Sequence, residues 1–272
     1  RGRLHVPVLT LRYWYMGQAT LPGSAAPPAE QLGLGGHNLR VAGVLGHRFE
    51  RTGTALFAAL RYDLTLRQTR RGRYAAWRGA TYHAPFVRLG FHQKLRGRWG
   101  LTGYGLAGLG SDMRAVDAGD LRLVLGAAAT YAVSRDLRFV FGAMYTTTFY
   151  LPLPLPLLGV YYRSGPWRVH LRIPQGLQGW WTPARWVELG IVFSTLNLRH
   201  GLHADDRIGD ELNWLNVTAG PALRFYLYRG AHLTLQGGYN VRNIRLTRDD
   251  RVVHDRLLWK GGFVSASAGY LL

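Results

Sequence analysis

The 272-residue chain has no cysteine, few acidic residues and no long hydrophobic run. Without cysteine it can form neither a disulfide scaffold nor a thiolate metal site. A transmembrane helix needs roughly eighteen consecutive apolar residues, and no stretch of the chain supplies them, so a helical span is excluded. Amphipathic patterns with the helical period also stop within about two turns. These absences leave an all-β chain.

The shortage of acidic residues gives the chain its strongest bias in composition. It has 15 Asp and Glu against 34 Lys and Arg, a formal net charge of +19. Such an excess attracts phosphates, whether of nucleic acid, lipopolysaccharide or small anions. Inside a β-barrel it would favour anions in the lumen. The positions of the basic residues decide between these partners.

The segment Thr54–Arg67 shows the pattern that organises the chain. Leu60 and Tyr62 belong to an apolar set at its even positions, and Arg61 and Asp63 to a mostly polar set at its odd positions. Alternation over this length indicates a β-strand with one apolar and one polar face. A tilted strand of roughly nine to eleven residues crosses a bilayer, so this strand is long enough. The pattern is typical of a transmembrane β-barrel.

Similar alternation recurs along the rest of the chain. It predicts fourteen strands, and the weak one at Pro174–Trp181, if removed with its neighbour, would leave twelve. The strands with predicted bounds are Leu4–Tyr15, Gly35–Phe49, Thr54–Arg67, Thr81–Lys94, Trp99–Gly110, Leu121–Tyr131, Leu137–Thr146, Pro174–Trp181, Trp186–Leu196, Trp214–Leu227, His232–Ile244 and Leu257–Leu272, and two more flank the turn Arg163–Pro166. We therefore expect a single domain over residues 1–272, an antiparallel up-and-down barrel.

The connections between these strands alternate between long and short. Outer-membrane barrels have an even number of strands, short periplasmic turns and longer external loops, so the alternation favours this class over a soluble sandwich. The long connections are predicted at Met16–Gln31, Gln68–Ala80, Ser111–Gly119, Asn197–Asn213 and Arg245–Arg256.

Aromatic residues near the predicted strand ends agree with an interfacial girdle. The residues are Tyr13, Trp14, Tyr15, Trp99, Tyr131, Tyr145, Trp167, Trp186, Trp214, Tyr226, Trp259 and Tyr270.

Basic residues dominate the face predicted to point inward. Few acids share it, with Asp63 and Glu188 the clear ones, and we expect Asp63 to pair with an inward arginine. The predicted pore-lining set, besides Asp63, is Arg40, Arg48, Arg61, Arg67, Arg88, Lys94, Arg122, Arg138, Arg168, Arg172, Arg224 and Arg242. A barrel of fourteen strands lies between small filled barrels and wide porins. These side chains would therefore either line a narrow anion-favouring passage or fill it.

A second group of arginines falls in or beside the predicted external loops, where they could pair with lipopolysaccharide phosphates or simply be solvated. The group comprises Arg67, Arg70, Arg71, Arg73, Arg78, Arg245, Arg248, Arg251 and Arg256. We expect outer-membrane lipid as a partner, with small anions and other envelope proteins as further candidates, and no nucleic acid.

The run Leu151–Leu157 alternates leucine with proline. Proline lacks an N–H group, so three prolines at every second position strip one edge of a strand of its donors. We therefore predict that the run lies above the membrane, as a stiff connector, an external apolar loop or a partner-binding surface. The candidate partner-binding residues are Leu151, Pro152, Leu153, Pro154, Leu155 and Pro156.

The segment L-P-L-P-L-L-G-V-Y-Y, followed by Trp167, resembles uncharacterised, porin-like bacterial outer-membrane β-barrel proteins of a domain family of unknown function. The similar step is Pro156, Leu157, Leu158 and Gly159, followed by Tyr161 or Tyr162. The resemblance implies the fold and the bacterial outer membrane, but no reaction. Such barrels usually end in an aromatic residue, and this chain ends in leucine.

No catalytic motif, phosphate-binding loop or zinc pattern is present, so we expect neither an enzyme nor a cofactor. A metal site or a membrane-protease dyad could be suggested by one group of residues, but polar loops often collect such residues by chance. The group is His200, His203, Asp205 and Asp206, with His254 and Asp255. No signal peptide is visible, and we expect one to have been removed on export. The sequence predicts a narrow anion-favouring pore or, alternatively, a non-conducting structural or docking subunit of a larger complex.

Overall fold

The computed structural model describes residues 7–19, 33–70, 81–148, 153–202, 211–227, 230–248, 251–255 and 259–271. Almost all of these residues lie in strands. The elements are β1 (Pro7–Ala19), β2 (Gly33–Phe49), β3 (Thr54–Arg70), β4 (Thr81–Lys94), β5 (Trp99–Leu109), the 3-10 helix η3 (Ala118–Asp120), β6 (Leu121–Ala132), β7 (Leu137–Thr146), β8 (Leu153–Ser164), β9 (Trp167–Ile173), β10 (Gly176–Ala184), β11 (Val187–Gly201), β12 (Glu211–Tyr226), β13 (Ala231–Arg248), β14 (Arg251–Asp255) and β15 (Trp259–Leu271).

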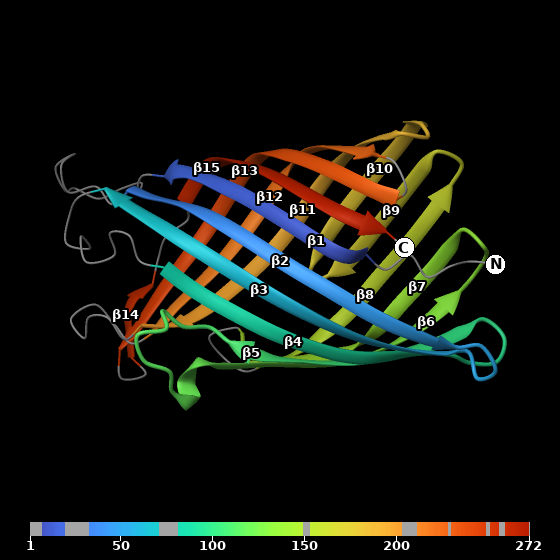
Figure 1. The fold of residues 1–272 in the computed structure, drawn as a ribbon, viewed down its shortest axis with the longest axis horizontal. Coiled ribbons are helices and arrows are strands. Elements are labelled where there is room, and N and C mark those ends of the chain that lie inside the picture. Colours follow the sequence, from blue (N-terminus) through green and yellow to red (C-terminus); the bar gives the residue numbers. More distant parts are fainter. Residues whose placement is uncertain are drawn as a thin grey trace.

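Fourteen of the described strands close into one antiparallel barrel (Figure 1). In the ring, consecutive strands from β1 through β13 pair with each other. β15 closes the ring by pairing with both β13 and β1. The short β14 lies outside the ring because it pairs only with β13. The predicted fourteen-stranded barrel is confirmed, and the weak strand is present as β10.

The barrel wall has an apolar exterior and a largely polar interior. In β3 the predicted faces are confirmed, because Leu60 is 66% exposed whereas Asp63 is 3% exposed. Leu45 and Ile191, on the outer faces of β2 and β11, are more than 70% exposed. This is the reverse of a soluble protein and is what a lipid-facing barrel requires, so the fold is a transmembrane β-barrel. No helix in the described ranges is long and apolar enough to cross a membrane.

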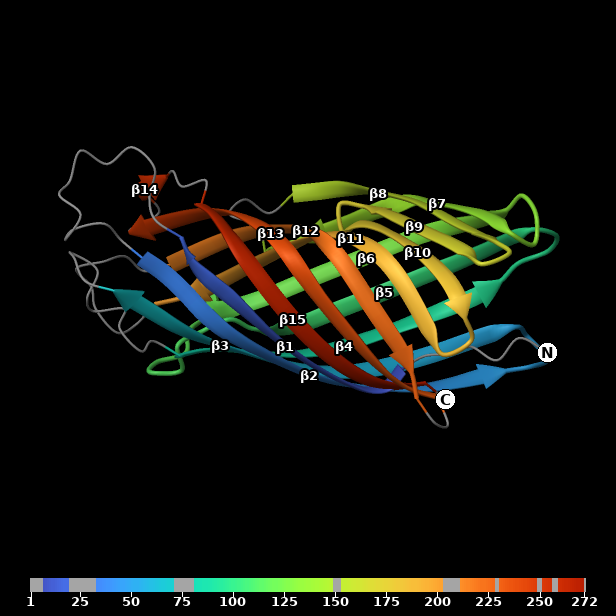
Figure 2. The ribbon, with the colours of Figure 1, turned by 90° about the horizontal axis from the view of Figure 1, so that it is seen from above.

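The strands fall into two groups by length. β1–β4, β11–β13 and β15 have 13 to 18 residues and form what we call the long-stranded half. β5–β10 have 7 to 12 residues and form the short-stranded half. β1 begins and β15 ends near the tight turns, which we call the short-turn end, and the opposite end is the long-loop end (Figures 1 and 2). The extra length of the long strands extends toward the long-loop end.

Several predicted loops are shorter than expected because strands continue into them. β3 reaches Arg70, β11 reaches Gly201 and β13 reaches Arg248. Arg67, Arg70, Arg245 and Arg248 therefore lie in strands rather than in loops. Beyond the membrane both faces of a strand meet polar surroundings, so the alternation that marks a strand fades before the strand ends.

Part of the predicted aromatic girdle is present at the short-turn end. Trp167 stacks on Trp181 with ring centroids 6.1 Å apart, and Trp99 lies 4.8 Å from Tyr131. These rings are on the outer face. Trp14, by contrast, is buried on the inner face, as is Trp214, so their assignment to the girdle was wrong. Alternation within β1 and β12 places both inside despite their position near strand ends.

The predicted external loop at the proline run is also wrong for its described part. Leu153–Pro156 lie in β8 and pair with β7, with Pro154 opposite Tyr145 and Pro156 opposite Ala143. Leu151 and Pro152 lie outside the described residues. A strand tolerates proline where its nitrogen faces a free edge, and β9 leaves that edge of β8 uncovered before Leu158.

Candidate anion site

Asp63 holds two arginines together on the inner face of β2 and β3. Arg40 donates from Nε to Oδ1 at 2.6 Å and from Nη2 to Oδ2 at 2.9 Å. Arg61 approaches Oδ2 at 3.2 Å. The first contact is a bidentate pair, the strongest geometry for an arginine and a carboxylate. The prediction that Asp63 pairs with an inward arginine is confirmed.

Arg12 on β1 extends this group. Its guanidinium and that of Arg40 both lie 5.4 Å from the ring of the buried Trp14. Arg12 also donates to Oε1 of Gln236 on β13 at 3.5 Å. Cation–π contacts of this kind stabilise a guanidinium without neutralising it. Arg12 therefore joins this group through Trp14 and Gln236, whereas Arg40 and Arg61 contact the Asp63 carboxylate itself.

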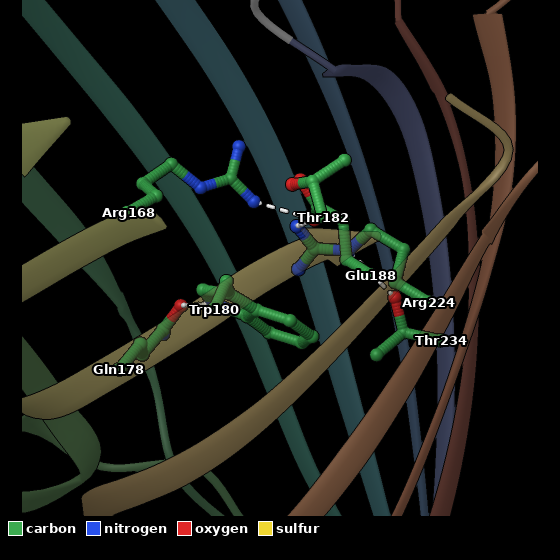
Figure 3. Close-up of polar contacts among 7 residues, drawn as sticks. All are labelled: Arg168, Gln178, Trp180, Thr182, Glu188, Arg224 and Thr234. Carbon is green, nitrogen blue, oxygen red and sulfur yellow. Dashed lines mark hydrogen bonds and ion pairs between the residues drawn. The ribbon is translucent and has the colours of Figure 1, made fainter. Parts of the chain in front are cut away.

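Glu188 organises a second group on β9–β12 (Figure 3). Its Oε2 accepts from Arg168 at 2.6 Å and from Arg224 at 3.1 Å, and its Oε1 accepts from Thr182 at 3.3 Å. Figure 3 shows the two arginines pointing toward Glu188 from different strands, with Trp180 beside them. Arg224 lies 4.2 Å from the Trp180 ring.

Arg88 and Arg172 connect the two groups. Arg88 on β4 lies 4.5 Å from the Tyr104 ring, and Arg172 on β9 lies 5.0 Å from the Tyr161 ring. Their charges interact with each other although four strands separate β4 from β9 around the wall. Arg88 also interacts with Arg61. Electrostatic repulsion thus couples Arg88 to Arg61 on one side and to Arg172 on the other, and Arg172 shares β9 with Arg168 of the Glu188 group.

We call this set the arginine network: Arg12, Arg40, Arg61, Arg88, Arg168, Arg172 and Arg224, with Asp63 and Glu188. Its seven arginines and two carboxylates leave a formal charge of +5. Most of the guanidinium groups are held by a carboxylate or an aromatic face, so their positions are fixed. Arg88 and Arg172 are nevertheless exposed to solvent. A fixed, solvent-accessible positive charge between aromatic walls is suited to holding an anion.

Packed side chains fill the barrel at its long-loop end. Tyr82 on β4 lies 5.0 Å from the His200 ring on β11, and the Asn216 amide approaches Sδ of Met16 at 3.5 Å across two intervening strands. Tyr82, His200 and Met16 are each 1% exposed. His200, weighed above as a metal or protease residue, is thus part of this packing. We call this region the packed end.

Ser111 joins the two sides of the packed end. Its backbone exchanges hydrogen bonds with His83 of β4 at 2.8 and 3.1 Å, and Gly201 of β11 donates to Gly110 at 2.8 Å. Arg122 lies here rather than in the arginine network, and its Nε donates to the Arg199 carbonyl at 3.0 Å. Gly110 and Ser111, which lie between β5 and η3, thereby link β4 to β11 across the barrel.

The other predicted pore-lining residues lie away from the arginine network. Arg48, Lys94 and Arg138 are exposed near the short-turn end. The backbones of Arg67 and Arg242 lie in β3 and β13, but their side chains lie outside what the structure describes. Whether any of the predicted residues line a pore stays a prediction.

Sequence reasoning missed Arg12 and the aromatic partners of the arginines. The faces of the first strand were left ambiguous because Tyr13, Trp14 and Tyr15 are consecutive. The exposed Leu9, Leu11 and Tyr13 give the missing signal, since they place Arg12 on the opposite face. Which aromatic ring meets which arginine depends on the stagger between strands, which alternation alone does not encode.

A family of known sequences matches residues 86–250, more than half of the chain, and its description is "Domain of unknown function (DUF6268)". The chain belongs to this family. No curated protein matches it. The DUF6268 match begins in β4 and ends just after β13, so it includes the short-stranded half and Glu188 with its partners.

Several solved structures are similar to this DUF6268 protein in fold. The COG4313 outer membrane channel from Pseudomonas putida F1 has 10% identity and a TM-score of 0.45, covering 100% of this chain and 99% of that one. The NanC porin has 8% identity and a TM-score of 0.43, covering 97% and 100%. The translocator domain of the autotransporter NalP from Neisseria meningitidis has 12% identity and a TM-score of 0.39, covering 98% and 89%.

Proposed function

We propose that this protein is a bacterial outer-membrane channel of low conductance that favours anions. The observation that carries the proposal is the arginine network, in which Arg88 and Arg172 present exposed positive charge inside the barrel. Aromatic contacts hold both guanidinium groups in place. An anion near them gains electrostatic attraction, whereas a cation is repelled.

The outer membrane is the location that this fold supports. A barrel with an apolar exterior whose neighbouring strands are hydrogen-bonded satisfies most backbone groups within the wall, as a bilayer demands. Long loops at one end and tight turns at the other are typical of outer-membrane barrels. The exposed Arg51, Arg96 and Arg135 lie in the tight turns, which on this orientation face the periplasm.

The experiment is a measurement of single-channel current in planar bilayers with a KCl gradient. We expect small single-channel current steps. The reversal potential should be shifted toward the equilibrium potential of chloride rather than that of potassium. A charge about 4 Å from an ion in water contributes about 1 kcal/mol, so R88Q or R172Q should lower the preference for chloride by roughly fivefold. R96Q in an exposed turn is the matched control and should change it little. A cation preference in the unmodified protein would contradict the proposal.

A second candidate is a non-conducting structural or docking subunit of an envelope complex. The packed end favours it, because buried side chains occupy the direct route along the barrel axis. Absence of conductance in folded, reconstituted protein would favour this candidate. Arg-to-Gln changes in the arginine network would then alter stability without any effect on ion flow.

A further inference from the structure

Within the part of the chain that the structure describes, the wall of the barrel is incomplete beside β8. β8 pairs with β7 from Leu153 onward, but with β9 only from Leu158 onward. The two-residue turn Gly165–Pro166 connects β8 to β9, so the flanking residues Ser164 and Trp167 form a hydrogen-bonded pair. Because backbone groups alternate in direction along a strand, the other even-numbered residues of β8 also point their N–H and C=O groups toward the β9 side. Pro154 and Pro156 therefore face the uncovered edge. That edge carries carbonyl groups but lacks the N–H donors that would be costly in lipid.

The neighbouring hairpin stops below this edge. The β9–β10 connection at Pro174 and Gln175 is fixed to β11, where Thr195 donates its N–H to Gln175 at 3.1 Å and its hydroxyl to the Pro174 carbonyl at 2.5 Å. Past Thr195, β11 pairs with β12 alone and turns to Gly110 at the packed end. Among the described residues no strand fills the wall between this part of β11 and the β8 edge (Figure 2).

The surfaces on the two sides of this gap differ in chemistry. Outside, an apolar groove of about 760 Å³ runs over β3–β8 and ends at Pro154, with Leu89, Leu125 and Tyr145 among its lining residues. Inside, Arg172 precedes Pro174 by two residues and is exposed over the Tyr161 ring. An apolar surface therefore leads to the β8 edge from the membrane, and a positive charge lies close to the same gap within the barrel.

We propose that the interior opens sideways into the membrane between β8 and β11, and that this opening admits anionic amphiphiles, molecules with one acidic group on an alkyl chain. The acidic group contacts Arg172 while the chain lies along the β8 edge and its apolar groove. The packed end supports a lateral route because it obstructs the axial one. This inference rests on the proposed preference for anions and adds the class of molecule and its path.

The test uses dodecyl sulfonate below its micellar concentration, with methanesulfonate as the same head group without a chain. Because the chain contains no native cysteine, single cysteines can be placed without further changes. L155C lies on the free β8 edge, and M144C lies directly opposite it on β7 within the paired wall. Both side chains are on the inner face, so a bulky maleimide attached to either cysteine enters the interior at the same level. Only the label at L155C lies on the free edge, and labelled M144C is therefore the matched control.

We expect dodecyl sulfonate to reduce the chloride current at concentrations where methanesulfonate does not. Maleimide-labelled L155C should lose this inhibition, and labelled M144C should retain it. Equal effects of the two labels, or equal inhibition by the two sulfonates, would overturn the lateral route.

A photoreactive alkyl sulfonate provides a readout that does not depend on current. It should attach to the β8 edge and to the β9–β10 connection, with less attachment in R172Q. Attachment confined to the short-turn end would overturn the proposal. If attachment occurs as expected but no chloride current exists, the proposed channel fails while the amphiphile site stands.

Discussion

The two halves of the barrel differ most at the long-loop end. In the long-stranded half, eight strands continue past the neighbouring hairpins, and their inner side chains interlock across the barrel. Ser111 then bridges β4 to β11. Eight strands make a barrel just wide enough to be filled by side chains. The long-stranded half thus resembles a small filled barrel at this end, although the wall has fourteen strands nearer the turns.

The short-stranded half contributes mainly wall, although Arg122 at the start of β6 belongs to the packed end. Its strands end early, and the β9–β10 connection has two residues at a position where neighbouring connections are long. Strand length, rather than strand number, therefore determines where side chains fill the interior and where the wall ends. The Glu188 group connects the two halves, in addition to the wall pairings β4–β5 and β10–β11. The Ser111 bridge, by contrast, joins β4 and β11 within the long-stranded half, so the two contacts offer separate tests of this division.

The largest effect is expected from removing the charge of Glu188. E188Q leaves Arg168 and Arg224 without their shared carboxylate, and breaking such a buried pair costs about 3 kcal/mol. Because Arg168 belongs to β9, we expect faster hydrogen exchange in β9 and β10 as well as lower stability in urea. D63N is the matched change, since its partners lie on β2 and β3 within the long-stranded half. Identical exchange patterns in E188Q and D63N would contradict the division.

A smaller loss is expected from disturbing the Ser111 bridge. A Cβ at Gly110 would overlap the carbonyl oxygen of Arg199, so G110A must push β11 away from the bridge. Overpacking of this kind costs about 2 kcal/mol. The expected results are a lower urea midpoint and new protease sensitivity at the long-loop end. G179A in β10 is the control because nothing lies within 4 Å of its new Cβ. Equal stability of the two variants would show that the bridge contributes nothing.

The sequence predicts much of the barrel because residues that face lipid must be apolar, whereas the alternate residues that face the interior are mostly polar. That contrast correctly predicted the number of strands, the faces of β3 and the pairing of Asp63. It failed at Arg70, Gly201 and Arg248, where the strands leave the membrane and the contrast disappears. The Ser111 bridge could not be predicted either, since it joins β4 to β11 through a single residue in a predicted loop.

The arginine network was predicted as a set of residues but not as an arrangement. Alternation places Arg88 and Arg172 on the inner face, yet it does not reveal which aromatic rings hold them, Tyr104 for Arg88 and Tyr161 for Arg172. The proline run shows the converse problem. Proline was rightly expected to remove donors from one edge, but the edge is free within the wall rather than in a loop. Only the short length of β9 explains this, and no residue pattern marked it.

The β8 edge gives a third test of the division. P156A adds an N–H group that points to the uncovered edge, and an unsatisfied donor there costs about 1 kcal/mol. We expect a correspondingly lower urea midpoint in lipid vesicles. P166A is the control, because its new N–H lies in an exposed turn and meets water. If P156A were as stable as P166A, the free edge would have to be paired or hydrated.

The smallest effect is expected at the short-turn end, where the two halves should behave alike. Trp167 stacks on Trp181 in the short-stranded half, and Trp186 stacks on Phe225 of β12 with centroids 6.4 Å apart. Aromatic pairs of this kind contribute about 0.5 to 1 kcal/mol. W167A and W186A should therefore lower the urea midpoint by similar small amounts in lipid vesicles. A much larger loss in W186A would mean that the long-stranded half also dominates at the turns, and the division would then extend along the whole barrel rather than begin where the short strands end.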